Sequence, residues 1–271
     1  MQHASDNWAT AIFVAIVSLI IVLKVVMAQR GIVPTIRRIA GLNAIDEAVG
    51  RATEMGRPVL MVPGIWPISI PTLQAMNIFG HIAKSVATYG NHTIMPVCDA
   101  SVVGIGEEVL RDAYTSAGRP ELFSSDDVRF LSDQQFAFAS GVAGIIEREK
   151  PAASFLMGAF FAESLILAET GQRAGAIQVA ATPQTTQLPF FIAACDYVLL
   201  GDEFYAASAY LSRNPTLLGS IVGQDYAKVV FIIAIVIGTV CATVLGAQGI
   251  DVKHMGDLHS PWRTFIDFFV K

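Results

Sequence analysis

The stretch ASFLMGAFFAESLILAETGQRAGAIQVAAT, residues 153–182, decides the fold. Its pattern predicts an apolar strand over Ala153–Met157, a helix over Ala162–Thr170 that Gly171 ends, and a second apolar strand over Ala176–Ala180. Two apolar strands joined by a helix are typical of a β-α-β unit, because parallel neighbours need a crossover connection. The stretch therefore predicts a parallel sheet that is covered on both faces.

The same alternation continues on both sides of this stretch. Four further strands are expected, at 58–62, 92–97, 128–131 and 197–200, and six further helices, at 43–55, 72–88, 106–117, 133–150, 184–195 and 202–213. Because crossovers in such sheets are right-handed, the pattern favours an α/β fold with a doubly wound, mostly parallel, Rossmann-like sheet.

The composition separates this α/β segment from the two ends of the chain. Of the 271 residues, 53% are hydrophobic and only 15% are charged, and the mean hydropathy is +0.53. About a quarter of the residues of an ordinary soluble domain are charged. The net charge of −5 argues against general binding of nucleic acid. The three cysteines show no Cys-x-x-Cys spacing, so neither a zinc site nor a disulfide framework is indicated.

Two apolar segments predict a membrane protein. Residues 9–23 are uncharged, and Lys24 behind them is able to extend its ammonium to the membrane surface, which lengthens the segment to about 20 residues. Residues 229–247 are also uncharged. The alternative for the first segment is a cleaved signal peptide, but its basic residues follow the apolar run rather than precede it. We expect two transmembrane helices, with Trp8 as an interfacial anchor of the first.

The basic residues predict the orientation in the membrane. They cluster after the first segment and before the second, at Lys24, Arg30, Arg37, Arg38 and Lys228. The positive-inside rule then places the central domain in the cytoplasm and both termini outside. The expected organisation is an anchor at 1–28, a basic connector at 29–42, the α/β domain at 43–227, a transmembrane helix at 228–249 and an outer tail at 250–271.

Both ends of the chain carry candidate contact surfaces. Four small residues recur every four positions in the second segment, at Ala234, Gly238, Ala242 and Gly246, which favours close packing of another helix over a chance pattern. In the tail, four apolar residues share one helical face, which predicts an amphipathic helix in the membrane interface or docked on a partner protein: Trp262, Phe265, Ile266 and Phe269.

Candidate ligand-binding residues follow the predicted strands. Ligands of parallel sheets bind beyond the carboxyl ends of the strands, where this sequence places Asp99, Ser101, Glu163, Thr182 and Thr185. These loops contain neither lysine nor arginine, and the nearest glycine pair, in residues 104–106, lacks the third glycine of a dinucleotide fingerprint. We therefore expect a polar, weakly charged ligand or none, and not a triphosphate.

No group of residues indicates catalysis. The chain lacks a Gly-x-Ser-x-Gly elbow, and Cys98 has only His81 and His92 of the same domain as potential bases. Four acidic residues are better explained as helix caps than as a cation site: Glu163, Asp196, Asp202 and Glu203. A metal site in the tail has four candidate ligands and is not favoured either: Asp251, His254, Asp257 and His259. We expect no catalytic residue, no metal and no cofactor.

Several of these segments resemble a known family. They are Phe155–Ser164, Gln178–Thr182, Gln187–Phe191, Cys195–Tyr197, Gly201–Glu203 and Tyr205–Ser212. The chain resembles, from about Asn43 to the second apolar segment, a family of prokaryotic membrane proteins catalogued as a domain of unknown function. The resemblance implies a membrane-anchored domain and supplies no catalytic residue.

Two hypotheses on function follow. The first is a membrane-anchored structural or assembly subunit of an oligomeric complex, whose partners are the lipid bilayer and further copies of the chain or other membrane subunits. The alternative is a membrane-tethered α/β domain that binds a small molecule or a nucleotide, with or without enzymatic activity. A ligand in the strand-end loops distinguishes the two.

Overall fold

The computed structural model describes residues 8–31 and 40–247 of the chain. The chain divides into two compact units, one of residues Ile36–Arg213 and one that joins Met1–Thr35 with Asn214–Lys271. The contacts expected of the tail residues Trp262, Phe265, Ile266 and Phe269, the tail metal candidates and the side chain of Trp8 lie outside the described residues.

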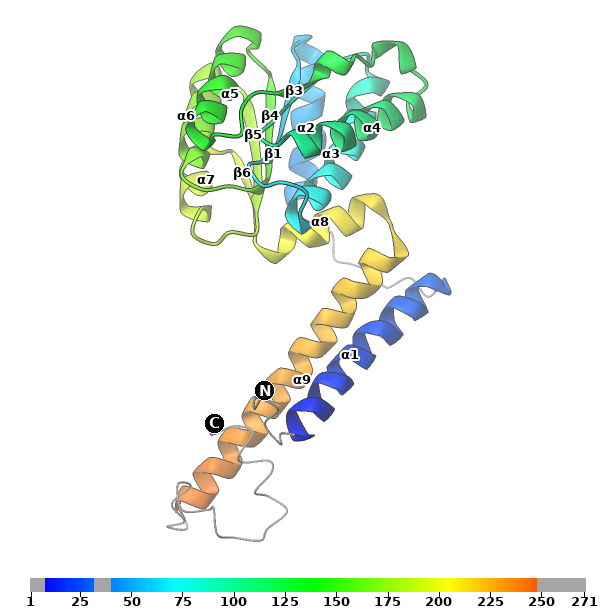
Figure 1. Ribbon diagram of the computed structural model, residues 1–271, viewed down its shortest axis with the longest axis vertical. Helices are drawn as coiled ribbons and strands as arrows, with labels where there is room; N and C mark the ends of the chain where they lie inside the picture. Colours follow the sequence, from blue (N-terminus) through cyan, green and yellow to red (C-terminus); the bar gives the residue numbers. More distant parts are fainter. Residues whose placement is uncertain (1–7, 32–39, 248–271) are drawn as a thin grey trace. The chain divides into compact units, whose positions relative to one another are not determined.

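The α/β unit is built on one parallel sheet (Figure 1). All neighbouring strands pair in parallel, in the order β3-β2-β1-β4-β5-β6. This is the order of the doubly wound nucleotide-binding fold, so the predicted fold class is confirmed. The strands are β1 (Val59–Gly64), β2 (Thr93–Val97), β3 (Val128–Phe130), β4 (Ala153–Ala159), β5 (Ile177–Thr182) and β6 (Tyr197–Leu200).

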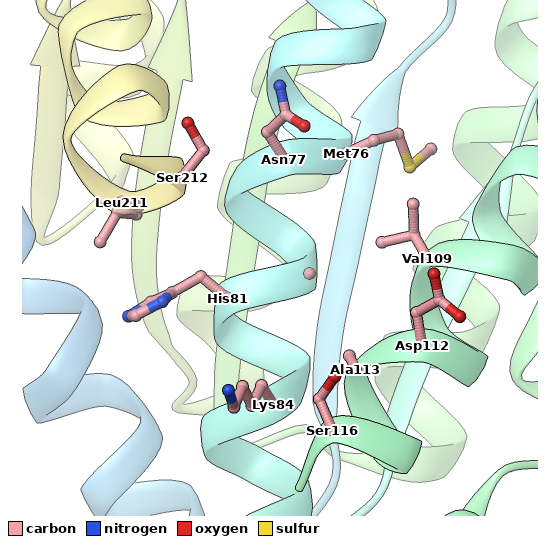
Figure 2. Close-up of a pocket in the computed structure, with 11 residues that line it drawn as sticks. Met76, Asn77, His81, Lys84, Val109, Asp112, Ala113, Ser116, Leu211 and Ser212 are labelled. Atoms are coloured by element: carbon pink, nitrogen blue, oxygen red, sulfur yellow. The ribbon is translucent and has the colours of Figure 1, made fainter. Parts of the chain in front are cut away.

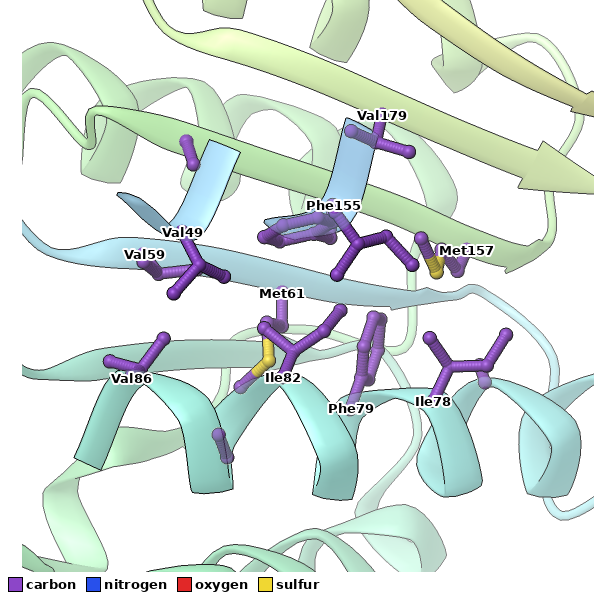
Figure 3. Close-up of a cluster of buried hydrophobic side chains, with 14 of the residues drawn as sticks. Val49, Val59, Met61, Ile78, Phe79, Ile82, Val86, Phe155, Met157 and Val179 are labelled. Atoms are coloured by element: carbon purple, nitrogen blue, oxygen red, sulfur yellow. The ribbon is translucent and has the colours of Figure 1, made fainter. Parts of the chain in front are cut away.

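Helices cover both faces of the sheet, as alternate residues of β1 show. Val59 and Met61 belong to one buried cluster, drawn in Figure 3, and Leu60 and Val62 to the other. The first cluster contains residues of α2 (Ala40–Met55), α3 (Ile70–Thr88), α4 (Ala100–Ser116) and α8 (Asp202–Ser212). The second contains residues of α5 (Gln135–Glu149), α6 (Glu163–Ala174) and α7 (Leu188–Ala194).

Some helix ends differ from the predicted ones. Helix α6 continues through Gly171 to Ala174 and ends at Gly175, whose φ of +73° suits glycine. Gly171 is a helical residue, and a glycine fits there because the side chain of Gln178 occupies the space that a Cβ would need. Gln178 Oε1 lies only 2.2 Å from the position of that Cβ. Helix α4 begins six residues earlier than expected, capped by Asp99, and α7 is four residues shorter at its start.

Gln178 also links three elements of the core. Its buried side-chain amide donates to the carbonyl oxygens of Ala168 in α6 and Ala194 in α7, at 2.7 and 3.0 Å. Its backbone N–H donates to Asp196 Oδ2 at 2.8 Å. Gln178, a polar residue in a buried strand, therefore links the sheet by hydrogen bonds to two helices on one of its faces.

The second unit is an antiparallel helix pair. Helix α1 (Trp8–Gln29) lies along α9 (Pro215–Ala247), which begins well before the predicted transmembrane segment (Figure 1). The ring of Phe13 contacts the ring of Phe231 edge-on at 5.1 Å, and Gln29 Nε2 donates to Thr216 Oγ1 at 3.2 Å. The ammonium of Lys24 lies 3.8 Å from the ring centre of Tyr226, a cation–π contact.

Small residues bring the two helices together, but at a different place from the predicted stripe. A Cβ on Gly219 would lie 2.7 Å from Val25 Cα, and a Cβ on Gly223 would lie 3.0 Å from Ile21 Cα. Ala227 is buried on the same face, which Ala234 and Gly238 continue as half-buried residues. The side chain of Ala242 and the surroundings of Gly246 lie outside the described residues. The close contacts of Gly219 and Gly223 thus precede the predicted stripe by several turns, and the stripe itself stays a prediction.

Candidate functional site

The strand order locates the position where such sheets bind ligands. Strands β1 and β4 are neighbours, and the chain leaves β1 towards α3 on one face and β4 towards α6 on the other. The carboxyl ends of these two strands therefore form the switch point at which a doubly wound sheet ordinarily opens a crevice.

The backbones of β1 and β4 stay in close contact at this switch point. A Cβ on Gly64, at the end of β1, would lie 2.3 Å from Ala159 O, and a Cβ on Gly158 would lie 2.1 Å from Pro63 O. The N–H of Ile65 continues the pairing by donating to Ala159 O at 3.0 Å. Both glycines have positive φ, +88° and +135°, in a region where the strand register shifts. The two strands therefore remain in contact where the crevice is expected.

Aromatic side chains fill the space next to the closed switch point. Phe160 is fully buried and packs edge-on against Phe191, with ring centres 5.4 Å apart. Trp66 and Phe161, one from each strand-end loop, lie with ring centres 6.0 Å apart and are each 38% exposed. The loops thus present rings where nucleotide-binding loops present backbone N–H groups.

The N-terminus of α3 is not shaped to hold a phosphate. Thr72 turns its hydroxyl inward, donating to Pro67 O at 2.9 Å and bonding Ser69 Oγ at 2.8 Å. Pro71, in the first turn of the helix, has no N–H to donate. The residues on either side of Ser69 are the exposed Ile68 and Ile70. The exposed side chains at this helix end are consequently apolar, and the Thr72 hydroxyl already has two hydrogen-bond partners within the chain.

Four of the five predicted ligand-binding residues have hydrogen-bond partners within the unit. Asp99 caps α4 by accepting from Ser101 N at 2.8 Å, and it also accepts from the Ser101 hydroxyl. Glu163 is fully buried and accepts from Phe161 N at 2.9 Å and from Gln135 Nε2 at 2.5 Å. Both groups therefore fix the loops that carry them.

The other two predicted residues are Thr182, the last residue of β5, and Thr185 in the loop behind it. Thr182 is buried, donates to Gln184 Oε1 at 2.8 Å and accepts from Gln184 N at 3.2 Å. Thr185 is exposed.

Cys98 lies at the end of β2 and is poorly suited to nucleophilic chemistry. Burial raises the pKa of its thiol to about 11, and the negative charges of Glu163, Asp99 and Asp133 act in the same direction. Burial likewise raises the pKa of Cys195 to about 12. Reactive cysteines have a lowered pKa, so neither thiol is activated.

The strand-end loops and the first turn of α5 carry exposed apolar side chains, which the sequence analysis did not single out as a group. We call this group the rim patch, and it consists of Trp66, Ile68, Ile70, Phe136 and Phe161. Ile70 is 67% exposed and Phe136 59%, and Gln135, next to Phe136, bonds Glu163 two residues from Phe161. The signal in the sequence was the run Ile-Trp-Pro-Ile-Ser-Ile-Pro, in a loop where polar and glycine residues are usual.

A surface groove lies elsewhere on the α/β unit. It is a groove of about 320 Å³ between α3, α4 and α8, shown in Figure 2. His81 and Lys84 of α3 line it together with Asp112 and Ser116 of α4, over a floor that includes Gly80. Burial lowers the pKa of His81, and the charges of Lys84 and Arg213 lower it further against the opposing effect of Asp46.

Among the described residues, no group of three or more histidine, cysteine, aspartate or glutamate side chains is placed to hold a metal ion. In the same described ranges, two helical stretches are long and apolar enough to cross a membrane, 11–29 and 215–240. Only 6% and 11% of their most apolar windows are buried within the chain, whereas the core helix of a soluble protein is mostly buried.

Comparison with known proteins places the chain in a family. The model of the family described as "Domain of unknown function (DUF6754)" matches residues 2–253, and the chain belongs to this family. The resemblance expected from the sequence is thereby confirmed, over a longer part of the chain. Neither the curated proteins nor the solved structures gave a significant match.

Proposed function

We propose that the chain is a membrane-anchored assembly subunit whose α/β unit docks a partner protein through the rim patch. One observation carries this proposal: the switch point of the sheet is closed by its own backbone, and exposed apolar side chains surround it. Exposed apolar patches of this kind mark interaction sites, because single exposed residues are common but contiguous ones are not. A docking surface thus replaces the usual ligand crevice.

Charge supports a protein partner over a lipid surface. The strand-end loops carry Asp99 and Asp133 and contain neither lysine nor arginine. Acidic groups repel the anionic headgroups that attract peripheral proteins to membranes. They complement a partner surface with an apolar centre and basic residues around it, which is the ordinary anatomy of a protein interface.

Helices α1 and α9 supply the anchor in this proposal. Their outward faces are apolar, with Ile12, Leu19, Ile233 and Val236 all more than half exposed. A bilayer covers such faces, and the basic residues Arg30, Arg37 and Arg38, which follow α1 in the sequence, favour a cytoplasmic α/β unit with both termini outside. The bilayer and other membrane subunits are then the partners, without nucleic acid or catalysis.

Site-specific photo-crosslinking tests the docking surface. A photoreactive amino acid at Ile68 or Ile70 of the full chain should give a cross-linked adduct of one defined mass in native membranes. Tyr89, which is 64% exposed at the opposite end of α3, is the matched control and should give none. Equal adducts at all three positions, or none at Ile68 and Ile70, would contradict the proposal.

Adding a positive charge to the rim patch gives the complementary test. Ile70→Arg places a cation on the rim patch, where it opposes a basic partner, and should release that partner during purification in mild detergent. Because Ile70 is 67% exposed, the substitution should leave the melting temperature of the isolated chain nearly unchanged. Tyr89→Arg adds the same charge at the opposite end of α3 and should retain the partner.

One observation favours a second candidate function, the binding of a small polar molecule. The groove between α3, α4 and α8 is lined by Lys84 and His81 of α3 and by Asp112 of α4, so its lining offers both a cation and an anion. Its volume is at the lower end of the range of ligand sites. A small zwitterion such as an amino acid fits this chemistry.

Thermal-shift measurements with a panel of amino acids test this candidate. A stabilising amino acid whose effect is lost in Lys84→Gln and retained in Lys150→Gln, a lysine outside the groove, would support it. The absence of any shift at millimolar concentrations would remove it, and would leave the docking proposal untouched.

A further inference from the structure

The pairing of α1 with α9 sets which residues share a depth. Phe13 lies opposite Phe231, and Ile21 lies opposite Gly223. Residues 224–230 of α9 are therefore level with the part of α1 between Phe13 and Ile21, which is uncharged throughout. Asp225 and Lys228 fall within this interval, so they lie level with the middle of the apolar segment of α1.

These two charged residues lie on the outer face of α9. At about 100° per residue, positions 225 and 228 are on the side opposite Gly223, which packs on α1. Their side chains are 67% and 57% exposed, and Asp225 Oδ1 lies 3.7 Å from Lys228 Nζ. The ion pair thus faces away from the helix hairpin, at the depth where α1 is most apolar.

Charged groups at that depth are expensive to expose to lipid, and such residues ordinarily face another protein segment. Moving the pair out of the bilayer would draw the apolar face of α1 into water, because the two helices are locked by the close contacts of Gly219 and Gly223. A protein surface that covers the ion pair lets both helices lie in the bilayer without exposing these charges to lipid.

The residues around the ion pair indicate which surface that is. Residues Ile221, Asp225, Lys228, Ile232, Ile235 and Thr239 are spaced alternately by four and three positions along α9. This spacing forms a continuous seam, as in paired helices. Ile232 and Ile235 are 60% and 59% exposed, and the Thr239 hydroxyl bonds its own backbone at Ile235 O. The seam therefore combines apolar contact area with one charge of each sign.

We propose that this seam packs against the same seam of a second copy of the chain. Two copies inserted in the same direction are related by a two-fold axis along the membrane normal, so their α9 helices run parallel. Asp225 of one copy then lies about 4.5 Å in height from Lys228 of the other, within reach of the lysine side chain. The two-fold repeats the contact, and four charges neutralise one another in the bilayer. This inference rests on the membrane insertion of the proposed function.

Cysteine cross-linking of the full chain in native membranes tests the seam. In a background with Cys98, Cys195 and Cys241 replaced by alanine, Ile232→Cys should form an oxidised dimer. Ile233→Cys is the matched control, since Ile233 is 52% exposed, equally apolar and about 100° off the seam. Equal cross-linking at both positions would overturn the proposal.

Charge reversal separates contacts between copies from contacts within one chain. Asp225→Lys and Lys228→Asp each abolish the ion pair within the chain and bring like charges together in a dimer. Each alone should reduce the Ile232→Cys cross-link about tenfold. Differently tagged copies of the two variants, expressed together, should restore it, because each positive seam then meets a negative one.

Two results contradict the dimer: single variants that cross-link like the parent, and a mixture that cross-links no better than either variant alone. Neither result touches the rim patch, whose photo-crosslinks arise in the α/β unit. Loss of both the α9 dimer and the rim adduct would instead remove the proposed function itself.

Discussion

Replacing Gly158 by alanine tests whether the switch point of the sheet is closed. The backbone at Gly158 has a φ of +135°, and an added Cβ would lie 2.1 Å from Pro63 O and 2.8 Å from Pro63 C. Backbone strain of this kind costs about 1–3 kcal/mol, and displacing the packed neighbour adds about 1–3 kcal/mol. We therefore expect Gly158→Ala to lower the free energy of unfolding by about 2–6 kcal/mol.

Gly175→Ala is the matched control for this prediction. Gly175 also has a positive φ, +73°, but nothing lies within 4 Å of its added Cβ, so only the strain of about 1–2 kcal/mol applies. Urea unfolding of the full chain in detergent measures both variants. With Trp8→Phe and Trp262→Phe, the fluorescence comes from Trp66 beside the switch point. If the two glycine variants cost the same, the strand ends are not in contact and the crevice is open.

Three further predictions concern other parts of the chain. Because burial lowers the pKa of His81, the unfolded chain takes up that proton more readily, so stability should fall as the pH drops below about 6.5, and His81→Gln should flatten this dependence in thermal melts from pH 7.5 to 5.5. With a pKa of about 11, Cys98 should react with iodoacetamide at pH 8 about 100-fold more slowly than an unperturbed thiol; mass spectrometry that finds rapid modification would show an activated cysteine. Gly223→Leu, placed against Ile21 Cα, should separate α1 from α9 and abolish a disulfide engineered between Phe13→Cys and Phe231→Cys, whereas Val222→Leu on a neighbouring face should preserve it.

The sheet could be predicted from the sequence because its strands are buried on both faces. Runs such as Val59–Val62 and Phe155–Met157 are uniformly apolar, and a parallel sheet between two helical layers requires such runs. Right-handed crossovers and the alternation of strands with helices then favour the doubly wound class. The six strands predicted in this way are confirmed, and so is the family, which was expected from a resemblance.

The details that depend on single contacts could not be predicted. Gly171 was expected to end a helix because glycine is common at helix C-termini. It is instead a helical residue, whose missing side chain leaves room for Gln178 of a neighbouring strand. Gly64 and Gly158 lie far apart in sequence, and only their pairing shows that they close the switch point. Gly219 and Gly223 precede residues 229–247, the predicted transmembrane segment. The stripe of small residues was predicted within that segment, so the contact of these two glycines with α1 was not expected.

The candidate ligand site at the strand ends stays a prediction, and the structure shows which partners its residues have. The loops at the carboxyl ends of the strands, where a parallel sheet ordinarily binds its ligands, contain the close contact of β1 with β4 and the exposed rings of Trp66 and Phe161. The polar residues chosen there, Asp99, Glu163 and Thr182, bond their own loops and helices. Apolar side chains such as Ile68, Ile70 and Phe136 are exposed beside them. A ligand crevice and a docking surface therefore share a position and differ in which side chains face outward.

The structure of the complex purified from native membranes in mild detergent tests the central claim most directly. The account predicts a neighbouring protein chain seated on Trp66, Ile68, Ile70, Phe136 and Phe161, with basic residues near Asp99 and Asp133. A rim patch open to solvent, or a small molecule held between the ends of β1 and β4, would contradict it.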